Sequence, residues 1–91
     1  MAVHPIPRVI TLPFGYRISI KQLNKAAFKV KHNAVFGNGD EADTVAFCIP
    51  ADKGAEIILD QRRKWTDKRD DLFHELSHVM VEYGEYIKTI H

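Results

Sequence analysis

Four stretches in the first two thirds of the chain have the spacing of β-strands. Residues 9–12 are mostly apolar and precede Pro13, and residues 16–21 alternate apolar and polar side chains, as a strand with one buried face does. Residues 44–49 form an apolar run rich in β-formers that stops at Pro50, and residues 56–60 form a further short strand. Between these stretches, residues 21–32 fit either a helix or a strand, and residues 37–40 predict a turn.

The last third of the chain predicts one long amphipathic helix over residues 67–89. Its apolar side chains recur at steps of three and four, the spacing of a helix packed on a core. The predicted stripe consists of Phe73, Leu76, Met80, Tyr83, Ile87 and Ile90. Thr66 or Asp67 suits the N-cap, and Gly84 is a weak point inside the helix. The whole pattern predicts a single α+β domain over residues 1–91, with a small mixed or antiparallel sheet of three to five strands before this C-terminal helix.

Within the predicted helix, residues 74–78 read His-Glu-Leu-Ser-His, the H-E-x-x-H pattern of zinc hydrolases. Positions four apart on a helix lie one turn apart on the same face, so both imidazoles can reach one cation. Two histidines at this spacing are common on helix surfaces, and the glutamate between them is what favours a metal site. We therefore expect His74 and His78 to bind Zn²⁺ and Glu75 to act as general base. The predicted stripe puts both histidines away from the centre of the buried face.

The surroundings of the motif carry a family resemblance. The run from Arg69 to Val79 (RDDLFHELSHV), after a strand that ends at Asp60, resembles the gluzincin-type zinc metallopeptidases, and especially the small ImmA/IrrE-like and phage-encoded members. The resemblance spans roughly residues 44–83. It implies a minimal zincin-like fold with zinc on the two histidines, Glu75 as general base, and a protein substrate such as a phage or mobile-element repressor. Such a site also needs a sheet edge beside the metal to align an extended peptide, and residues 44–49 or 56–60 are the candidates.

The third zinc ligand departs from that family. Gluzincins take it from a second helix further along the chain, whereas only residues 79–91 follow His78 here. The metzincin pattern also fails, because Val81 and Gly84 occupy its glycine and third-histidine positions. Glu82, one turn after His78, is the first choice as the third ligand. The other donors considered are Glu85, His91, His4, His32 and a residue of a second protomer.

Composition and charge narrow the classes of function. The formal net charge of +1 argues against broad binding to nucleic acid, and the short basic run at residues 62–64 is interleaved with acidic residues. No stretch has the apolar length needed to span a bilayer, and the first residues lack the features of a signal peptide. The lone cysteine, Cys48, excludes an internal disulfide and is expected to be a buried small hydrophobe. A cytoplasmic location without a membrane partner is the expectation.

Two hypotheses of function follow. The first is a small zinc-dependent metallopeptidase, encoded by a phage or mobile element, that hydrolyses a peptide bond in a protein or peptide substrate. The alternative is a catalytically reduced zincin-fold protein that binds or regulates a partner. That partner would be a host protein or a second copy of the chain, docked on the helix face that carries Tyr83, Tyr86, Ile87 and Ile90.

Overall fold

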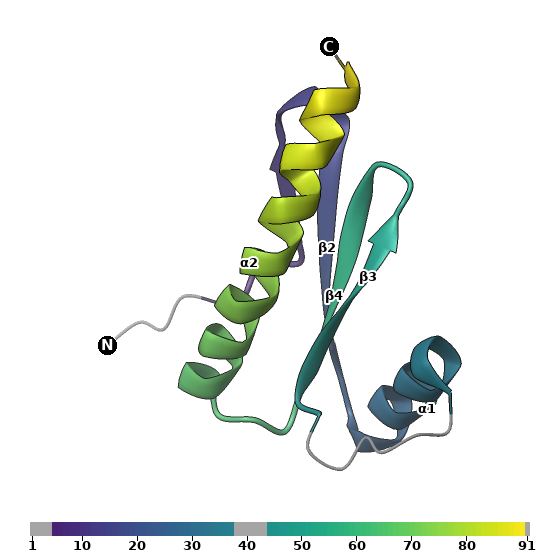
Figure 1. The fold of residues 1–91 in the computed structure, drawn as a ribbon. Helices are drawn as coiled ribbons and strands as arrows, with labels where there is room; N and C mark the ends of the chain where they lie inside the picture. The colour runs from purple at the N-terminus through teal and green to yellow at the C-terminus, as the bar shows by residue number, and fades with distance from the viewer. Residues whose placement is uncertain (1–4, 38–43, 91) are drawn as a thin grey trace.

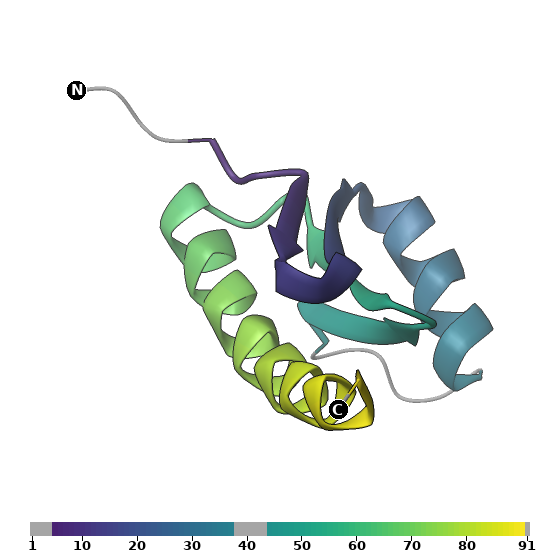
Figure 2. The same cartoon turned by 90° about the horizontal axis from the view of Figure 1, so that it is seen from above.

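The computed structural model describes residues 5–37 and 44–90. A four-stranded sheet lies between two helices (Figures 1 and 2). In chain order the elements are β1 (Val9–Leu12), a 3₁₀ turn (Pro13–Gly15), β2 (Tyr16–Leu23), α1 (Lys25–Phe36), β3 (Ala46–Ala51), β4 (Gly54–Asp60) and α2 (Trp65–Ile90). The predicted α+β class and the long C-terminal helix are therefore confirmed.

The sheet is mixed, with strand order β1-β2-β4-β3. β1 is antiparallel to β2, β2 is parallel to β4, and β4 is antiparallel to β3. β3 therefore lies at an edge, so of the two candidate edges it is the one at residues 44–49 that the structure has, whereas residues 56–60 belong to an interior strand. The reason is that β4 is buried along nearly its whole length, which fits a strand covered on both faces and paired on both sides.

The pairing of β2 with β4 requires a glycine at its start. A Cβ added at Gly54 would lie 1.8 Å from the backbone oxygen of Arg17, far inside contact distance. The N–H of Arg17 also donates to the carbonyl oxygen of Lys53 at 3.0 Å, next to this close approach. Gly54 therefore sets how closely the parallel strands meet, at the end of the sheet where the β3–β4 turn lies.

Each face of the sheet packs against one helix. On one face α1 contributes Phe28, which packs with Phe47 of β3 and Ile58 of β4. On the other face α2 covers the larger cluster (Figure 2). The buried members of that larger cluster are Tyr16, Ile18, Ile20, Ala55, Ile57, Leu59, Leu72, Val79 and Tyr83.

The face of α2 that meets the sheet differs from the predicted stripe. Its buried side chains are Leu72, Glu75, Val79 and Tyr83, whereas Phe73 and Met80 are 59% and 47% exposed. Both the predicted and the observed set of residues have helical spacing. Packing against the apolar face of the sheet determines which set is buried. The helix is therefore rotated about its axis relative to the prediction, and Glu75 belongs to the buried sector.

The expected docking face of α2 is largely used inside the fold. Tyr83 is buried, and Tyr86 and Ile87 pack against the core, so of that group Ile90 keeps the most exposure, 44%. Tyr83 and Tyr86 also donate from their hydroxyl groups to the carbonyl oxygens of Pro13 and Phe14. These contacts hold the C-terminal half of α2 against the start of β2. Along the described ranges, no helix is long and apolar enough to cross a membrane.

The bounds of several elements also differ from the predictions. α2 begins at Trp65, so Thr66 and Asp67 lie in its first turn and neither is the N-cap. The ambiguous stretch 21–32 divides between the end of β2 and α1, whose N-cap is Asn24, with its side-chain oxygen accepting from the Ala27 N–H at 2.9 Å. Of the predicted turn, only Gly37 falls among the described residues, where it ends α1 with a φ of 82°.

A further difference concerns β3, which continues through Pro50 to Ala51. The Asp60 N–H donates to the carbonyl oxygen of Val45, so every second residue from Val45 faces β4. Pro50 belongs to the alternate set, whose backbone groups point away from β4. A proline is tolerated there because the ladder to β4 needs no N–H at that position.

Two arginine–aspartate pairs shape the connection from β4 to α2. Asp60 Oδ1 accepts from the Arg62 backbone N–H and Nε at 2.9 and 3.1 Å, and Oδ2 accepts from Nη2 at 2.8 Å. Arg63 binds the carboxylate of Asp71 through Nε and Nη2 at 3.0 and 3.1 Å. The Asp60–Arg62 pair stabilises the bend of the chain at the end of β4. The Arg63–Asp71 pair connects this bend to the second turn of α2.

We expect Gly54→Ala to lower the free energy of unfolding by about 3 kcal/mol or more, because its methyl group would overlap the backbone of β2. Gly84→Ala is the matched control. A Cβ at Gly84 would have no other atom within 4 Å, and alanine favours a helix more than glycine does. The same substitution should therefore raise the free energy of unfolding by about 1 kcal/mol. Urea unfolding followed by circular dichroism measures both. Equal effects of the two substitutions would contradict the close approach of β2 and β4.

Asp60→Asn should destabilise in a pH-dependent way. The side-chain hydrogen bonds from Arg62 hold the pKa of Asp60 below its ordinary value, against the opposing effect of burial. A lowered pKa in the folded state means that the stabilisation is present above the ordinary aspartate pKa, about 3.9, and is lost as the pH falls through the folded value.

At pH 7 we expect Asp60→Asn to cost about 1 kcal/mol, since Arg62 is more than half exposed and solvent screens part of the interaction. The difference from the unmodified chain should shrink toward pH 3. Urea titrations across this range test the prediction, with the exposed Asp70→Asn as control. A difference that stays constant with pH would show that the charge of Asp60 is not what stabilises the turn.

Candidate metal centre

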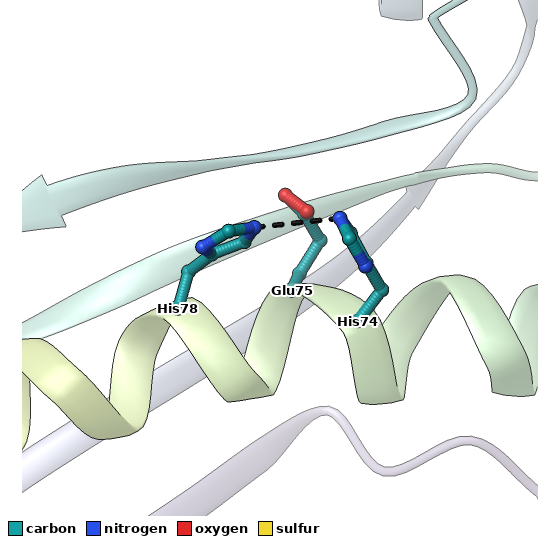
Figure 3. A group of neighbouring side chains, drawn as sticks. All are labelled: His74, Glu75 and His78. Atoms are coloured by element: carbon teal, nitrogen blue, oxygen red, sulfur yellow. Dashed lines mark hydrogen bonds between the residues drawn. The ribbon is translucent and has the colours of Figure 1, made fainter.

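The three specified positions of the H-E-x-x-H pattern, His74, Glu75 and His78, come together on one side of α2. Their nearest ligand atoms all lie within 4.8 Å of one another, and the two Nε2 atoms are 3.3 Å apart. Both rings are exposed and nearly perpendicular, at 85°. Figure 3 shows the Glu75 carboxylate beside the line that joins the two nitrogen atoms. The convergence of the imidazoles predicted from the sequence is therefore present.

The separation of the two nitrogen atoms fits a zinc ion. Two ligands of a tetrahedral zinc, each about 2.0–2.1 Å from the metal, stand about 3.3 Å apart. His74 and His78 Nε2 have this separation, and both offer the imidazole nitrogen that zinc prefers. Without a metal, the same two atoms lie within hydrogen-bond distance, and the tautomers of the rings decide which one donates.

Glu75 is the unusual member of the group, because the residue is 93% buried and has no hydrogen bond or ion pair with any residue in the described ranges, while its carboxylate oxygens keep access to solvent. Partial withdrawal of a carboxylate from water still costs free energy when no protein group pairs with it. Its neighbours in the buried sector are apolar, with Leu72 and Val79 one turn away on either side. An acid held in this position is available to a proton donor that enters the site, such as a water molecule.

Glu82, the predicted third ligand, lies outside the group formed by the two histidines and Glu75. It sits one turn further along α2 and lines a cavity together with Glu85. As a zinc ligand, Glu82 therefore stays a prediction. His32 belongs to α1 and packs against Phe47 at 5.3 Å between ring centroids, on the face of the sheet opposite to α2. His4 and His91 lie outside the described residues.

Two side chains of the sheet have pKa values that acidic residues of α2 affect. Burial raises the pKa of the Cys48 thiol, and the negative charges of Glu75 and Glu82 raise it further. Burial also raises the pKa of Tyr16, followed by the effects of Glu82 and Cys48. Cys48 lies on β3 and Tyr16 at the start of β2. The alternation of residues 16–21 puts Tyr16 on a buried face, but no local pattern indicates that this face meets Glu82.

Comparison of the chain with family models, with curated proteins and with solved structures finds no match. The geometry of the site and the motif it contains are therefore what indicate a function.

If Glu75 is held buried at a cost in stability, Glu75→Gln should stabilise the metal-free protein. Glutamine has nearly the same shape without the charge, so we expect a gain of about 1 kcal/mol in the free energy of unfolding. The exposed Glu82→Gln is the control and should change stability by less than about 0.5 kcal/mol. Urea unfolding in the presence of a chelator measures both. Destabilisation by Glu75→Gln would mean that the carboxylate has a stabilising partner in solution.

Proposed function

We propose that this protein is a small zinc-dependent metallopeptidase that hydrolyses a peptide bond in a protein or peptide substrate. The observation that carries the proposal is the 3.3 Å separation of His74 Nε2 and His78 Nε2 with the buried Glu75 carboxylate beside them. Two imidazoles at the ligand separation of zinc and an unpartnered acid next to them are the parts that metal-assisted hydrolysis needs. The resemblance to the gluzincin-type peptidases adds the substrate class.

The outer edge of β3 is suited to bind an extended peptide. The backbone N–H and C=O groups of Ala46 and Cys48 point away from β4, and no strand in the described ranges pairs with them. The side chains of the metal centre project toward the side of α2 along which the β3–β4 hairpin runs (Figure 3). A peptide that adds to this edge would therefore run past His74 and His78 with its carbonyl groups in a regular array.

Each residue of the site has a separate role in this proposal. His74 and His78 hold the zinc ion, which when bound polarises the scissile carbonyl and makes an attacking water more acidic. Glu75 takes a proton from that water as its oxygen adds to the carbonyl carbon. The C–N bond then breaks, and Glu75 passes the proton to the leaving amine.

One observation favours the alternative, a zincin-fold binding or regulatory protein. The cluster in the described part of the chain supplies two imidazoles and the Glu75 carboxylate, whereas a catalytic zinc usually has three protein ligands besides the water. The zinc content of the purified protein separates the two functions. About one zinc per chain supports the peptidase, and a stable fold without zinc supports the binding protein.

The peptidase mechanism predicts different losses for the motif residues. Glu75→Gln should keep stoichiometric zinc and reduce hydrolysis of a fluorescently labelled casein by at least about 100-fold, because the general base is lost. His74→Ala and His78→Ala should lose both zinc and hydrolysis. Elemental analysis and the casein assay on the same preparations give the two readouts.

Asp70→Asn provides the control, since Asp70 is an exposed acid on the same helix and should leave both readouts unchanged. Hydrolysis that survives in purified Glu75→Gln would exclude the proposed mechanism. Zinc that survives in both histidine variants would mean that the metal is bound somewhere else.

A further inference from the structure

A cavity of about 340 Å³ lies between the C-terminal half of α2 and the β3–β4 hairpin, directly beyond the metal centre. Three acidic side chains line it, Asp52, Glu82 and Glu85, and among the described residues no lysine, arginine or histidine does. Asp52 and Glu82 have no ion pair in the described ranges, and Glu85 has only an exposed one with Lys88 at 3.3 Å. The cavity is therefore an anionic site with most of its charge unneutralised, although the whole chain has a formal net charge of +1.

A buried tyrosine in the same cavity also has a hydroxyl group without a hydrogen-bond partner among the described residues. Tyr16 lines the cavity, is 97% buried, and has no hydrogen bond from its hydroxyl group to any residue in the described ranges. Its ring is held in place by Tyr83 and Tyr86, each 5.1 Å away between centroids. The effect of Glu82 on the pKa of Tyr16 indicates that carboxylate and phenol are near each other. A ligand with several N–H donors could bind both groups.

The rest of the wall is apolar and aromatic, formed by Pro50, Ala55, Val79 and Tyr86 among others. Such a wall suits the methylene stem of a long side chain, and an aromatic ring adds attraction for a cation. The volume is at the lower end of the range for ligand pockets, which is enough for one amino-acid side chain. The lining therefore matches arginine or lysine better than a neutral or acidic side chain.

The position of the cavity relates it to the peptide path along β3. Side chains of an added strand alternate between the two faces of the sheet, and those on the α2 face would lie beside Cys48 and Pro50, which line the cavity. Glu82 lies about 6 Å beyond His78 along the helix axis. Two residues of an extended peptide span about 7 Å. A side chain about two residues from the scissile bond would therefore enter the cavity.

We propose that this cavity binds an arginine or lysine side chain of the substrate, about two residues from the bond that is cleaved. The assignment to a substrate residue rests on the proposed peptidase function, whereas the binding of a cationic side chain does not. It also gives Glu82 a role that differs from zinc binding, because its carboxylate cannot complete the metal centre while it binds a cation in the cavity.

Binding of two blocked tripeptides tests the proposal. The probes are acetyl-Ala-Arg-Ala-amide and acetyl-Ala-citrulline-Ala-amide, which have nearly the same shape and differ in the charge of the central residue. Titration into the ¹⁵N-labelled, metal-free full chain should show shifts at the cavity residues, with arginine bound about tenfold more tightly than citrulline. Glu82→Gln should weaken arginine binding by about twofold to fivefold, and Glu82→Gln with Glu85→Gln by about tenfold.

Asp70→Asn is the control, because it removes one exposed negative charge at the other end of α2. Equal binding of the two peptides, no saturable shifts, or an equal loss in Asp70→Asn would overturn the proposal. Loss of zinc from Glu82→Gln would overturn it as well, since Glu82 would then be a metal ligand.

Failure of the peptidase function gives a different result. If the protein shows no hydrolysis but still prefers the arginine peptide, the cavity remains a cation-binding site. Only its relation to a scissile bond is then excluded. Hydrolysis without any preference for arginine or lysine would leave the peptidase intact and exclude this role for the cavity.

Discussion

The rotation of α2 about its own axis is the constraint on which the site depends. Leu72, Val79 and Tyr83 are almost fully buried against the sheet, and together they allow the helix only one orientation. At about 100° per residue, this orientation puts Glu75 inside the buried sector and His78 and His74 about 60° and 100° to one side of it. That side is the one along which the hairpin of β3 and β4 runs (Figure 3). A helix turned to bury Phe73 and Met80 instead would carry the same motif without a strand beside it.

The same rotation explains why the fold tolerates a buried acid. The helix fixes the position of Glu75 relative to the two histidines. In this orientation Glu75 therefore lies in the same buried sector as Leu72, Val79 and Tyr83. Apolar burial on both faces of the sheet and the two arginine–aspartate pairs at the start of α2 offset the loss of stability caused by Glu75. A site that loses stability to keep a reactive group in place is common where that group has a chemical role. Glu75 fits this description better than either histidine, since both rings are exposed.

Local features of the site could be predicted from the sequence, and long-range ones could not. The convergence of His74 and His78 follows from helical geometry alone, and the alternation at residues 16–21 is enough to find β2. The prediction of the buried stripe of α2 was wrong because this helix has two apolar stripes with helical spacing. Only packing against the side chains of the sheet determines which stripe is buried. The interior position of β4 depends on its parallel pairing with β2, across an intervening helix and strand. The acidic cavity joins side chains from β2, the β3–β4 hairpin and α2, so no window of sequence contains it.

An exposed strand edge is usually a liability, because it can pair with other chains, and β3 has two features that limit this. It is only six residues long, and Pro50 occupies one of the positions whose backbone faces outward. Main-chain pairing along this edge can therefore use the N–H groups of Ala46 and Cys48 but has no donor at Pro50. A bound peptide would be held by its backbone beside the first half of β3 and would lose a ladder hydrogen bond at Pro50. Pro50 lines the cavity, so a side chain of the bound peptide can enter the cavity at this point. Binding there depends on that side chain rather than on the peptide backbone, and this can give selectivity for one residue type.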